Sequence, residues 1–318
     1  MHSNKITYYK VFRTLSLISN YDVIFYNFKK ESLTLINKSS FGGYLTAWHE
    51  AGSGGQKIVL LHCSLAHGGA WKGVMKLLSP DFKLYAPDLP GQGQSQDWDQ
   101  KILFQDQSVI ATVGLLNEIG EPCHLIGHSF GATVAMRIAL EFPELVKSLI
   151  LFEPVFFGCL QDAKNPMYEE WSVREKPYTD LVERGDFEGA SKAFMELWGT
   201  GAKWENLPSS QRSYIKDRIH LIAASSRSII TPGKNRMRLS DYEKVAKPVY
   251  LLEGENSPPV ISEVEKTLEN TFPNALRNII GKSGHMAPIT HPKEFSDEVR
   301  IFLTLNYYKF KSFRINRA

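Results

Sequence analysis

The chain has 318 residues, enough for one large α/β domain or for a domain with an insertion. Its hydrophobic content of 43% and charged content of 22% are ordinary for a globular protein. The formal net charge of +3 comes from the two ends, because residues 1–32 carry +3 and residues 306–318 carry +4, which leaves −4 on the body. This distribution argues against nucleic acid as the main partner, and we predict none.

Cysteine usage and hydropathy indicate the compartment. The three cysteines are Cys63, Cys123 and Cys159. They show neither the spacing of metal ligands nor a disulfide framework, which favours a reducing compartment. No apolar run reaches the roughly 18 residues of a membrane-spanning helix. The apolar piece near the N-terminus is interrupted by Asp22 and makes a weak signal peptide. We therefore predict a cytoplasmic protein, with secretion or export to the periplasm as the alternative.

The hydrophobic pattern predicts alternating strands and helices. Two antiparallel strands are expected at 33–37 and 43–49, joined by a turn near residue 42. The series then continues with strand 57–63, helix 70–78, strand 83–89, helix 103–119, strand 123–127, helix 130–142 and strand 146–154. It ends with strand 247–254, helix 259–271, strand 275–280 and helix 291–304. Such alternation, with continuous apolar strands, predicts a mostly parallel, doubly wound sheet that is covered by helices on both faces.

The interval between the strands at 146–154 and 247–254 is too long for a simple crossover. It is rich in helix formers and aromatic residues, so we expect residues 156–245 to form a helical cap over the strand ends. The predicted core then comprises residues 33–155 and 246–305. Residues 1–32 are expected to be an N-terminal extension of uncertain order, and residues 306–318 a basic C-terminal tail.

A serine stands between two glycines where a predicted strand meets a predicted helix, in "LIGHSFGATVAM". A turn this tight needs small neighbours, which Gly127 and Gly131 provide. It projects the Ser129 side chain above the sheet edge and aims the N–H groups of the new helix at developing negative charge. A chance match to this short pattern is common, but its place in the strand–helix series favours a nucleophile.

A serine hydroxyl needs a base before it can attack a substrate. His285 follows the last predicted strand, so its loop lies at the carboxyl ends of the strands, where ligands bind in doubly wound sheets. A lone histidine is more often structural, and His291, His128, His62 and His67 are taken to be so by default. We predict His285 as the general base.

The series of motifs resembles the α/β-hydrolase superfamily over roughly residues 35–304. In chain order the motifs are "LLHCSLAHGGAW" at 60–71, "DLPGQGQS" at 88–95, "GHSFG" at 127–131, "LILFEP" at 149–154, "LLEGENSP" at 251–258 and "GKSGHMAP" at 281–288. The resemblance implies an α/β-hydrolase fold with a helical cap insertion. It also implies a catalytic triad in the order nucleophile, acid, histidine.

The acid departs from the family's usual pattern. The usual Asp position after the seventh strand holds Ser257 here. Some members carry the acid at the end of the sixth strand, where this chain has Glu153 in an apolar run. Burying an unpaired carboxylate is costly, and a catalytic histidine would supply a partner. We predict Glu153 as the triad acid, with Glu255 as the alternative acid and backbone capping as the alternative role of Glu153.

The resemblance also assigns the oxyanion donors, which are the backbone N–H groups of Ser64 and Phe130. The family's usual glycine in this loop is Cys63 here, which affects how closely the loop approaches the substrate. For His67, a contact with the substrate is the alternative to a structural role, and Phe156 and Trp171 are also candidate substrate contacts. The aromatic residues of the cap favour an apolar acyl or alcohol group, and packing within the cap explains them equally well.

The predicted activity is hydrolysis of a carboxylic ester or related acyl compound through an acyl-enzyme intermediate. A serine nucleophile argues against epoxide hydrolases and haloalkane dehalogenases. It leaves thioesterases, lactonases, amidases, C–C bond hydrolases and metal-free perhydrolases, and, as a different class, a non-catalytic or single-turnover receptor. The predicted partner is a small-molecule substrate. We expect no metal and no organic cofactor, since the predicted mechanism calls for neither. The glycines of "GQGQS" are not a phosphate-binding loop, because no lysine follows them at the required spacing. The sequence leaves the oligomeric state open.

Overall fold

The computed structural model describes residues 35–230 and 237–304. The predicted N-terminal extension (1–32), the start of the first predicted strand and the basic tail (306–318) lie outside the described residues. From Ile36 on, the described residues form one compact unit. No helix among them is both long enough and apolar enough to cross a membrane.

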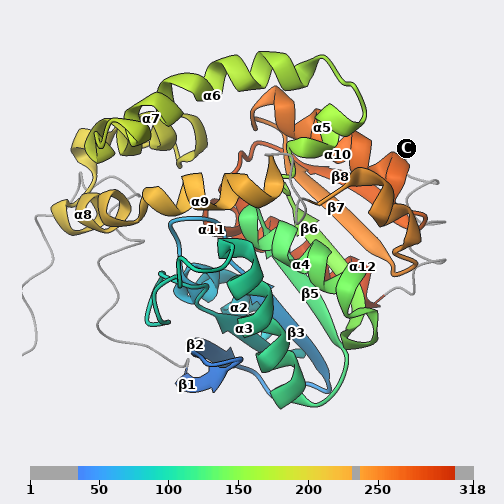
Figure 1. Ribbon diagram of the computed structural model, residues 1–318. Helices are drawn as coiled ribbons and strands as arrows, with labels where there is room; N and C mark the ends of the chain where they lie inside the picture. The colour runs from blue at the N-terminus through green and yellow to red at the C-terminus, as the bar shows by residue number, and fades with distance from the viewer. Residues whose placement is uncertain (1–34, 231–236, 305–318) are drawn as a thin grey trace, which may run out of the picture. The chain divides into compact units, whose positions relative to one another are not determined.

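An eight-stranded sheet in the order β1-β2-β4-β3-β5-β6-β7-β8 forms the centre of this unit (Figure 1). Its strands are β1 (Leu35–Phe41), β2 (Tyr44–Ala51), β3 (Gln56–Leu61), β4 (Phe82–Pro87), β5 (Cys123–His128), β6 (Val146–Phe152), β7 (Val249–Gly254) and β8 (Ala275–Ile280). β2 pairs with β4 in the antiparallel direction, and every pair from β4 to β8 is parallel. The predicted α/β fold with a mostly parallel sheet is confirmed.

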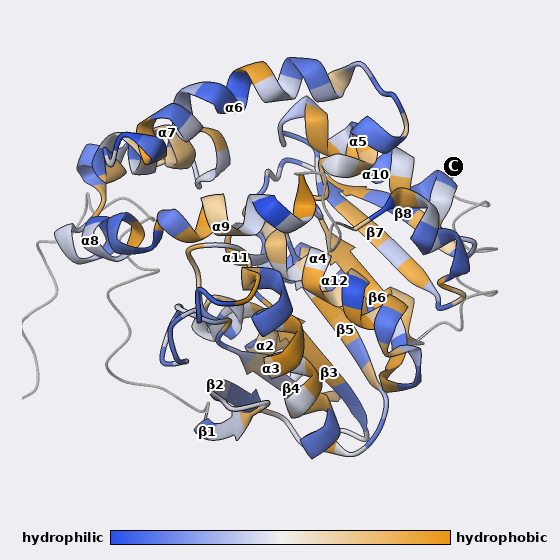
Figure 2. Cartoon of the chain, viewed as in Figure 1, coloured by the Kyte–Doolittle hydropathy of each residue, from blue (hydrophilic) through white to orange (hydrophobic). Residues whose placement is uncertain are grey.

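Helices cover both faces of the sheet because the central strands are apolar on both sides (Figure 2). In β3, Val59 and Leu61 face one hydrophobic cluster and Ile58 and Leu60 face the other. The first cluster includes α3 (Phe104–Ile119), α4 (Phe130–Glu141) and α10 (Pro259–Thr271). The second includes α2 (Lys72–Leu78) and α12 (Pro292–Thr304). The core therefore consists of two apolar layers with the sheet between them.

Between β6 and β7 the described chain is helical. The elements are α5 (Gly158–Asp162), α6 (Met167–Glu183), α7 (Phe187–Trp198), η3 (Trp204–Asn206), α8 (Ser209–Arg218), α9 (His220–Ile229) and η4 (Leu239–Lys244). Figure 1 shows α6 to α9 beyond the carboxyl ends of the strands. This segment, called the helical cap below, gives the fold the helical insertion that the sequence predicts.

Candidate active site

Ser129 lies at the turn from β5 into α4 with φ 56° and ψ −116°, a conformation that residues with a side chain rarely adopt. Its N–H donates to Phe152 O on the neighbouring strand (2.9 Å). A Cβ added to Gly131 would lie 2.3 Å from Leu61 O, and one added to Gly127 would lie 2.4 Å from the α4 backbone. Glycine is therefore needed on both sides of Ser129, and the start of α4 lies against the end of β3.

His285 is paired with Glu153. The Nδ1 atom of the imidazole lies 2.6 Å from Glu153 Oε2, and both side chains are buried. Because a carboxylate only accepts hydrogen bonds, Nδ1 carries the proton of the neutral ring and Nε2 keeps its lone pair. Among the described residues neither His285 Nε2 nor the Ser129 hydroxyl has a hydrogen-bond partner. This tautomer is the one that accepts a proton from a nucleophile.

The Glu153 carboxylate is held on both oxygens. While Oε2 faces His285, Oε1 accepts hydrogen bonds from Gly254 N (2.7 Å) and from the Ser257 hydroxyl. The residue is fully buried and has a φ of 49°, in the left-handed region that disfavours a side chain. Hydrogen bonds to the charged form compensate for the burial of that charge.

The alternative acid, Glu255, has a different hydrogen-bond partner. Its side chain is exposed and accepts a hydrogen bond from Lys282 N at 2.7 Å. Of the two acids that the sequence offers, the structure therefore brings only Glu153 into contact with His285.

Two further rings surround His285. The Nε2–H of His128 donates to the His285 carbonyl (2.7 Å), which ties the His285 loop to the residue before Ser129. Burial lowers the pKa of His128 well below its ordinary value, so this ring stays neutral. Trp198, the last residue of α7, lies edge-on to the His285 ring with centroids 4.9 Å apart. Sequence reasoning gave Trp198 no place at the site, because nothing local marks a cap residue that contacts the core.

The predicted oxyanion donors come from two elements. Phe130 is the first residue of α4, where backbone N–H groups have no partner within the helix. Ser64 belongs to the loop after β3. His62 holds this loop, since its Nδ1 contacts Cys63 O (2.7 Å) and its Nε2 accepts from Leu89 N (2.9 Å). Burial lowers the pKa of His62 to about 4, so the ring is neutral and has a structural role.

His67 lies in the same loop region but bonds to the protein itself. Its Nδ1 accepts from Gly69 N (3.1 Å) at the start of η1 (Gly68–Trp71). Among the described residues, the one group of three side chains that could hold a metal ion is His67 with His49 and Asp88. The two Asp88 oxygens already accept backbone N–H bonds, at 2.7 and 2.8 Å. These bonds give His67 and Asp88 a structural role.

The two predicted aromatic contacts differ in their surroundings. Phe156 has no exposed surface and packs edge-on against Tyr242 in the core, so its surroundings offer no surface to a substrate. Trp171 stacks on Phe157, with ring centroids 4.1 Å apart, and lines a pocket of about 680 Å³. Trp198 lines the same pocket, which lies between α6, α7 and the start of α10. This pocket therefore extends to a ring that contacts His285.

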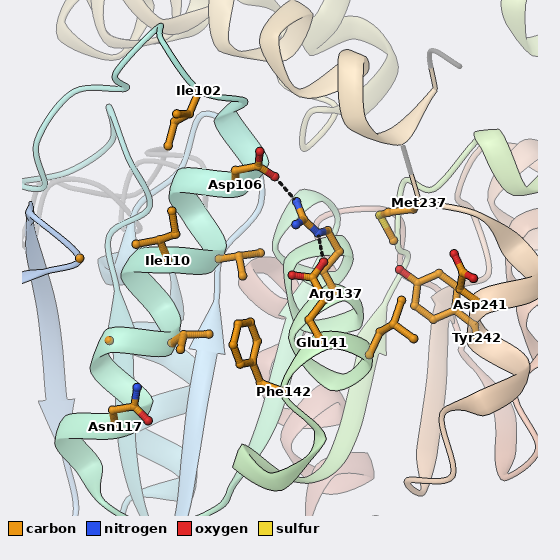
Figure 3. A pocket seen from close by; sticks show the side chains of 15 residues that line it. Ile102, Asp106, Ile110, Asn117, Arg137, Glu141, Phe142, Met237, Asp241 and Tyr242 are labelled. Atoms are coloured by element: carbon orange, nitrogen blue, oxygen red, sulfur yellow. Dashed lines mark hydrogen bonds and ion pairs between the residues drawn. The ribbon is translucent and has the colours of Figure 1, made fainter. Parts of the chain in front are cut away.

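A second pocket, of about 740 Å³, lies between α3, α4 and η4 (Figure 3). Its lining includes none of the predicted site residues. Arg137 bonds there to both Asp106 (2.6 Å) and Glu141 (2.7 Å). Because this guanidinium already faces two carboxylates, the lining that belongs to residues 35–230 and 237–304 offers no unpaired cation to an acidic substrate.

Residues 57–292 match the family model described as alpha/beta hydrolase fold. The chain belongs to this family. Among curated relatives, this alpha/beta hydrolase is 26% identical over 254 residues to the pimeloyl-[acyl-carrier protein] methyl ester esterase of Nitrosomonas europaea. The match covers 77% of this chain and 95% of the relative.

Solved structures share the fold of this alpha/beta hydrolase. Naproxen esterase from Bacillus subtilis superposes with a TM-score of 0.63 at 17% identity, over 85% of this chain and 91% of that one. Est816, described as an enzyme that degrades N-acyl homoserine lactones, superposes with a TM-score of 0.66 at 17% identity, over 84% of this chain and all of that one. At this identity the likeness concerns the fold alone.

Proposed function

We propose that this alpha/beta hydrolase cleaves a carboxylic ester through an acyl-enzyme intermediate. Ser129 is the nucleophile, His285 the general base and Glu153 the triad acid. The observation that carries this proposal is the bond between His285 Nδ1 and Glu153 Oε2, because it leaves Nε2 free to take the serine proton. The strained backbone of Ser129 supports the proposal, since strain of this kind gathers at functional sites.

In the first half of the reaction, Ser129 Oγ attacks the acyl carbonyl and its proton passes to His285 Nε2. The imidazolium that forms is stabilised by the Glu153 carboxylate, which is buried and therefore interacts strongly with a nearby charge. The backbone N–H groups of Ser64 and Phe130 donate to the tetrahedral oxyanion, where the loss of one donor typically costs about a hundredfold or more in rate. The imidazolium then protonates the leaving alcohol.

In the second half, His285 takes a proton from water, which attacks the acyl-enzyme carbonyl. The same two N–H groups stabilise the second oxyanion. Collapse of this intermediate breaks the bond to Ser129 Oγ, which recovers its proton from His285, and the carboxylic acid leaves. These residues need no metal ion or organic cofactor for any of these steps.

An apolar substrate group is favoured by the pocket beside Trp198. Its lining includes Trp171, Leu197 and Val260, together with Pro258, the neighbour of Ser257. We propose that the acyl or alcohol group of the substrate binds there. A small-molecule ester from the cytoplasm, the compartment that cysteine usage favours, fits this site. Curated relatives named as pimeloyl-[acyl-carrier protein] methyl ester esterases, among them those of Nitrosomonas europaea and Pectobacterium carotovorum, favour an ester over the thioester, lactone and C–C bond alternatives.

A fluorophosphonate probe read by intact mass tests the proposal. Wild type is compared with Ser129→Ala, Glu153→Gln and Glu255→Gln. We expect labelling of wild type and of Glu255→Gln, none of Ser129→Ala, and greatly slowed labelling of Glu153→Gln. Because Glu255 is exposed and bonds to Lys282 N rather than to His285, its variant is a matched control for the loss of one carboxylate.

Turnover of an activated ester completes the test. Steady release of product supports an enzyme, whereas release of a single equivalent would point to a receptor. Slowing in Glu255→Gln instead of Glu153→Gln would move the acid to the loop after β7. Absence of labelling in folded wild type would overturn the hydrolase proposal.

A further inference from the structure

A second carboxyl group lies directly behind the proposed acid. Glu265, on α10, has no exposed surface. Its Oε1 accepts a hydrogen bond from Glu153 N (3.1 Å), which also donates to Leu252 O (3.0 Å). Its other oxygen, Oε2, is buried and has no partner among the described residues. The side chain therefore contacts the backbone of Glu153 and leaves the carboxylate of Glu153 to His285.

The charges around Glu265 do not balance if it is ionised. Glu153 and Glu253 are the nearby anions, and Arg277 is the nearby cation. Arg277 is already paired with Glu253 and with Glu269 (Nε to Oε2, 3.2 Å). A third buried anion would have no counter-charge, which is the situation that a carboxyl group avoids by keeping its proton. Burial first, and the two anions second, raise the pKa of Glu265 well above its ordinary value.

We propose that Glu265 is a positioning residue for the reaction proposed above: as a neutral acid it holds the Glu153 backbone and keeps the negative charge of the cluster on Glu153. A neutral acid still accepts a hydrogen bond through its carbonyl oxygen. Glu153 needs such support because its backbone lies in the left-handed region. This proposal rests on the proposed function only in one respect, that the Glu153 carboxylate orients the His285 imidazole for catalysis.

Two substitutions separate position from charge. Glu265→Gln keeps an oxygen that accepts from Glu153 N and replaces the acidic O–H with an amide NH2, so the side chain stays neutral at every pH. We expect its kcat/KM to stay within about twofold of wild type, with the acid limb of the pH–rate profile in place. Glu265→Leu removes the acceptor and keeps the volume. We expect kcat to fall on the order of ten- to a hundredfold at unchanged KM, because Glu153 is then misplaced.

Stability distinguishes positioning from a merely structural role. Glu265→Leu removes two oxygens: Oε1, whose donor Glu153 N keeps its bond to Leu252 O, and Oε2, which is buried without a partner among the described residues. Its Tm is therefore expected to stay close to that of wild type. Ser296→Ala is the matched control, since Ser296 is also fully buried with an unpartnered hydroxyl but lies on α12. Its kinetics are expected to match wild type. Unchanged kcat in Glu265→Leu, or a kcat loss that parallels a large drop in Tm, would overturn the proposal.

An NMR titration of the His285 imidazole without substrate keeps this inference separate from the proposed function. The midpoint is expected to be the same in wild type and Glu265→Gln, and to move down in Glu153→Gln, which loses an adjacent negative charge. A downward move in Glu265→Gln would show that Glu265 is ionised and would overturn the inference. This readout holds even if wild type fails to hydrolyse esters, a result that would overturn the proposed function alone.

Discussion

The Ser257 hydroxyl donates a hydrogen bond to Glu153 Oε1, the carboxylate oxygen that faces away from His285. Ser257 occupies the position where the resemblance to other α/β-hydrolases leads one to expect an Asp. The loop after β7 thus still contacts the pair, as a hydrogen-bond donor to the proposed acid. Gly254 N from the same loop donates to the same oxygen.

Ser257→Ala removes one of the two hydrogen bonds to Glu153 Oε1. A hydrogen bond to a charged group contributes about 1.5–3 kcal/mol, so we expect kcat/KM to fall roughly ten- to a hundredfold with little change in the fold. Steady-state kinetics on an activated ester, with circular dichroism as the control for folding, measure this. Activity equal to wild type would show that the Ser257 bond does not support Glu153.

An acid placed in the loop after β7 tests whether this loop can supply the carboxylate of the proposed triad. Glu153→Gln alone is expected to lower kcat by about three to four orders of magnitude, the effect known for loss of a triad carboxylate. Adding Ser257→Asp is expected to recover at least tenfold of that loss, because residue 257 lies within hydrogen-bond reach of the Glu153 carboxylate. Equal kcat values for the single and double variants would count against an acid acting from this loop.

The glycine at the start of α4 is expected to be essential for stability. A Cβ at Gly131 would lie 2.3 Å from Leu61 O and 2.5 Å from His62 O, and backbone atoms cannot move aside cheaply. Gly131→Ala is therefore expected to destabilise the fold by about 1–3 kcal/mol or more. Gly55→Ala is the control, since nothing lies within 4 Å of its added Cβ. Urea titrations of both variants measure the difference, and equal midpoints would contradict the tight turn.

Glu175, on α6, is expected to report pH near neutrality. Burial raises the pKa of this half-buried side chain to about 7, against the smaller effect of its hydrogen bond from Trp198. Because the folded pKa exceeds the ordinary value of 4.5, the proton stabilises the fold at low pH, and this stability is lost as pH rises through about 7. Relative to Glu175→Gln, the Tm of wild type should therefore fall between about pH 5 and 8.

The same carboxyl group also has an optical readout. Ionisation next to the Trp198 indole should change its emission with a midpoint near pH 7, and this step should be absent in Glu175→Gln. The chain has 6 tryptophans, so the difference between the two proteins is the quantity to follow. Identical curves of emission against pH for the two proteins would show that ionisation of Glu175 does not cause the step.

The pocket lined by Trp171 is expected to determine how kcat/KM depends on the length of the acyl chain. Trp171→Ala enlarges the pocket of about 680 Å³ without touching Ser129 or His285. We expect kcat/KM to fall about tenfold or more for esters with medium acyl chains and to change little for acetate esters, because a lost aromatic contact removes apolar surface. A series of p-nitrophenyl esters measures this. A uniform fall across the series would indicate a structural effect.

Much of the fold could be predicted from the sequence because the parallel strands are continuous apolar runs. The helix over 259–271 and the strand over 275–280 agree with α10 and β8 in their bounds. Elsewhere the observed ends of strands differ from the predicted ends because side chains bond to the neighbouring backbone. The strand predicted to reach residue 89 ends at Pro87, because Asp88 turns to accept the N–H groups of Gly68 and Gln94.

The candidate site could be predicted only where residue type and strand ends coincide. Ser129, Glu153 and His285 each follow a strand, and parallel strands bring their carboxyl ends to one edge. The neighbours supplied by packing could not be predicted. Trp198 reaches His285 from the cap and Glu265 reaches Glu153 from α10, and periodicity does not say which helix faces which loop.

One tyrosine joins the cap to the loop after β3 and to the loop after β4. The Tyr214 hydroxyl, on α8, donates to Ala66 O (3.0 Å) and accepts from Gly93 N (3.2 Å). Ala66 lies two residues after Ser64, so α8 is bonded directly to the loop that carries the proposed oxyanion donor. For protein engineering, the bond between Tyr214 and this loop means that changes in the cap that alter substrate choice can also alter the reaction rate. Libraries that aim at new specificity without a loss of rate belong on the pocket-lining residues of α6, because α7 carries Trp198, which contacts His285. Changes near Tyr214 would alter both properties together.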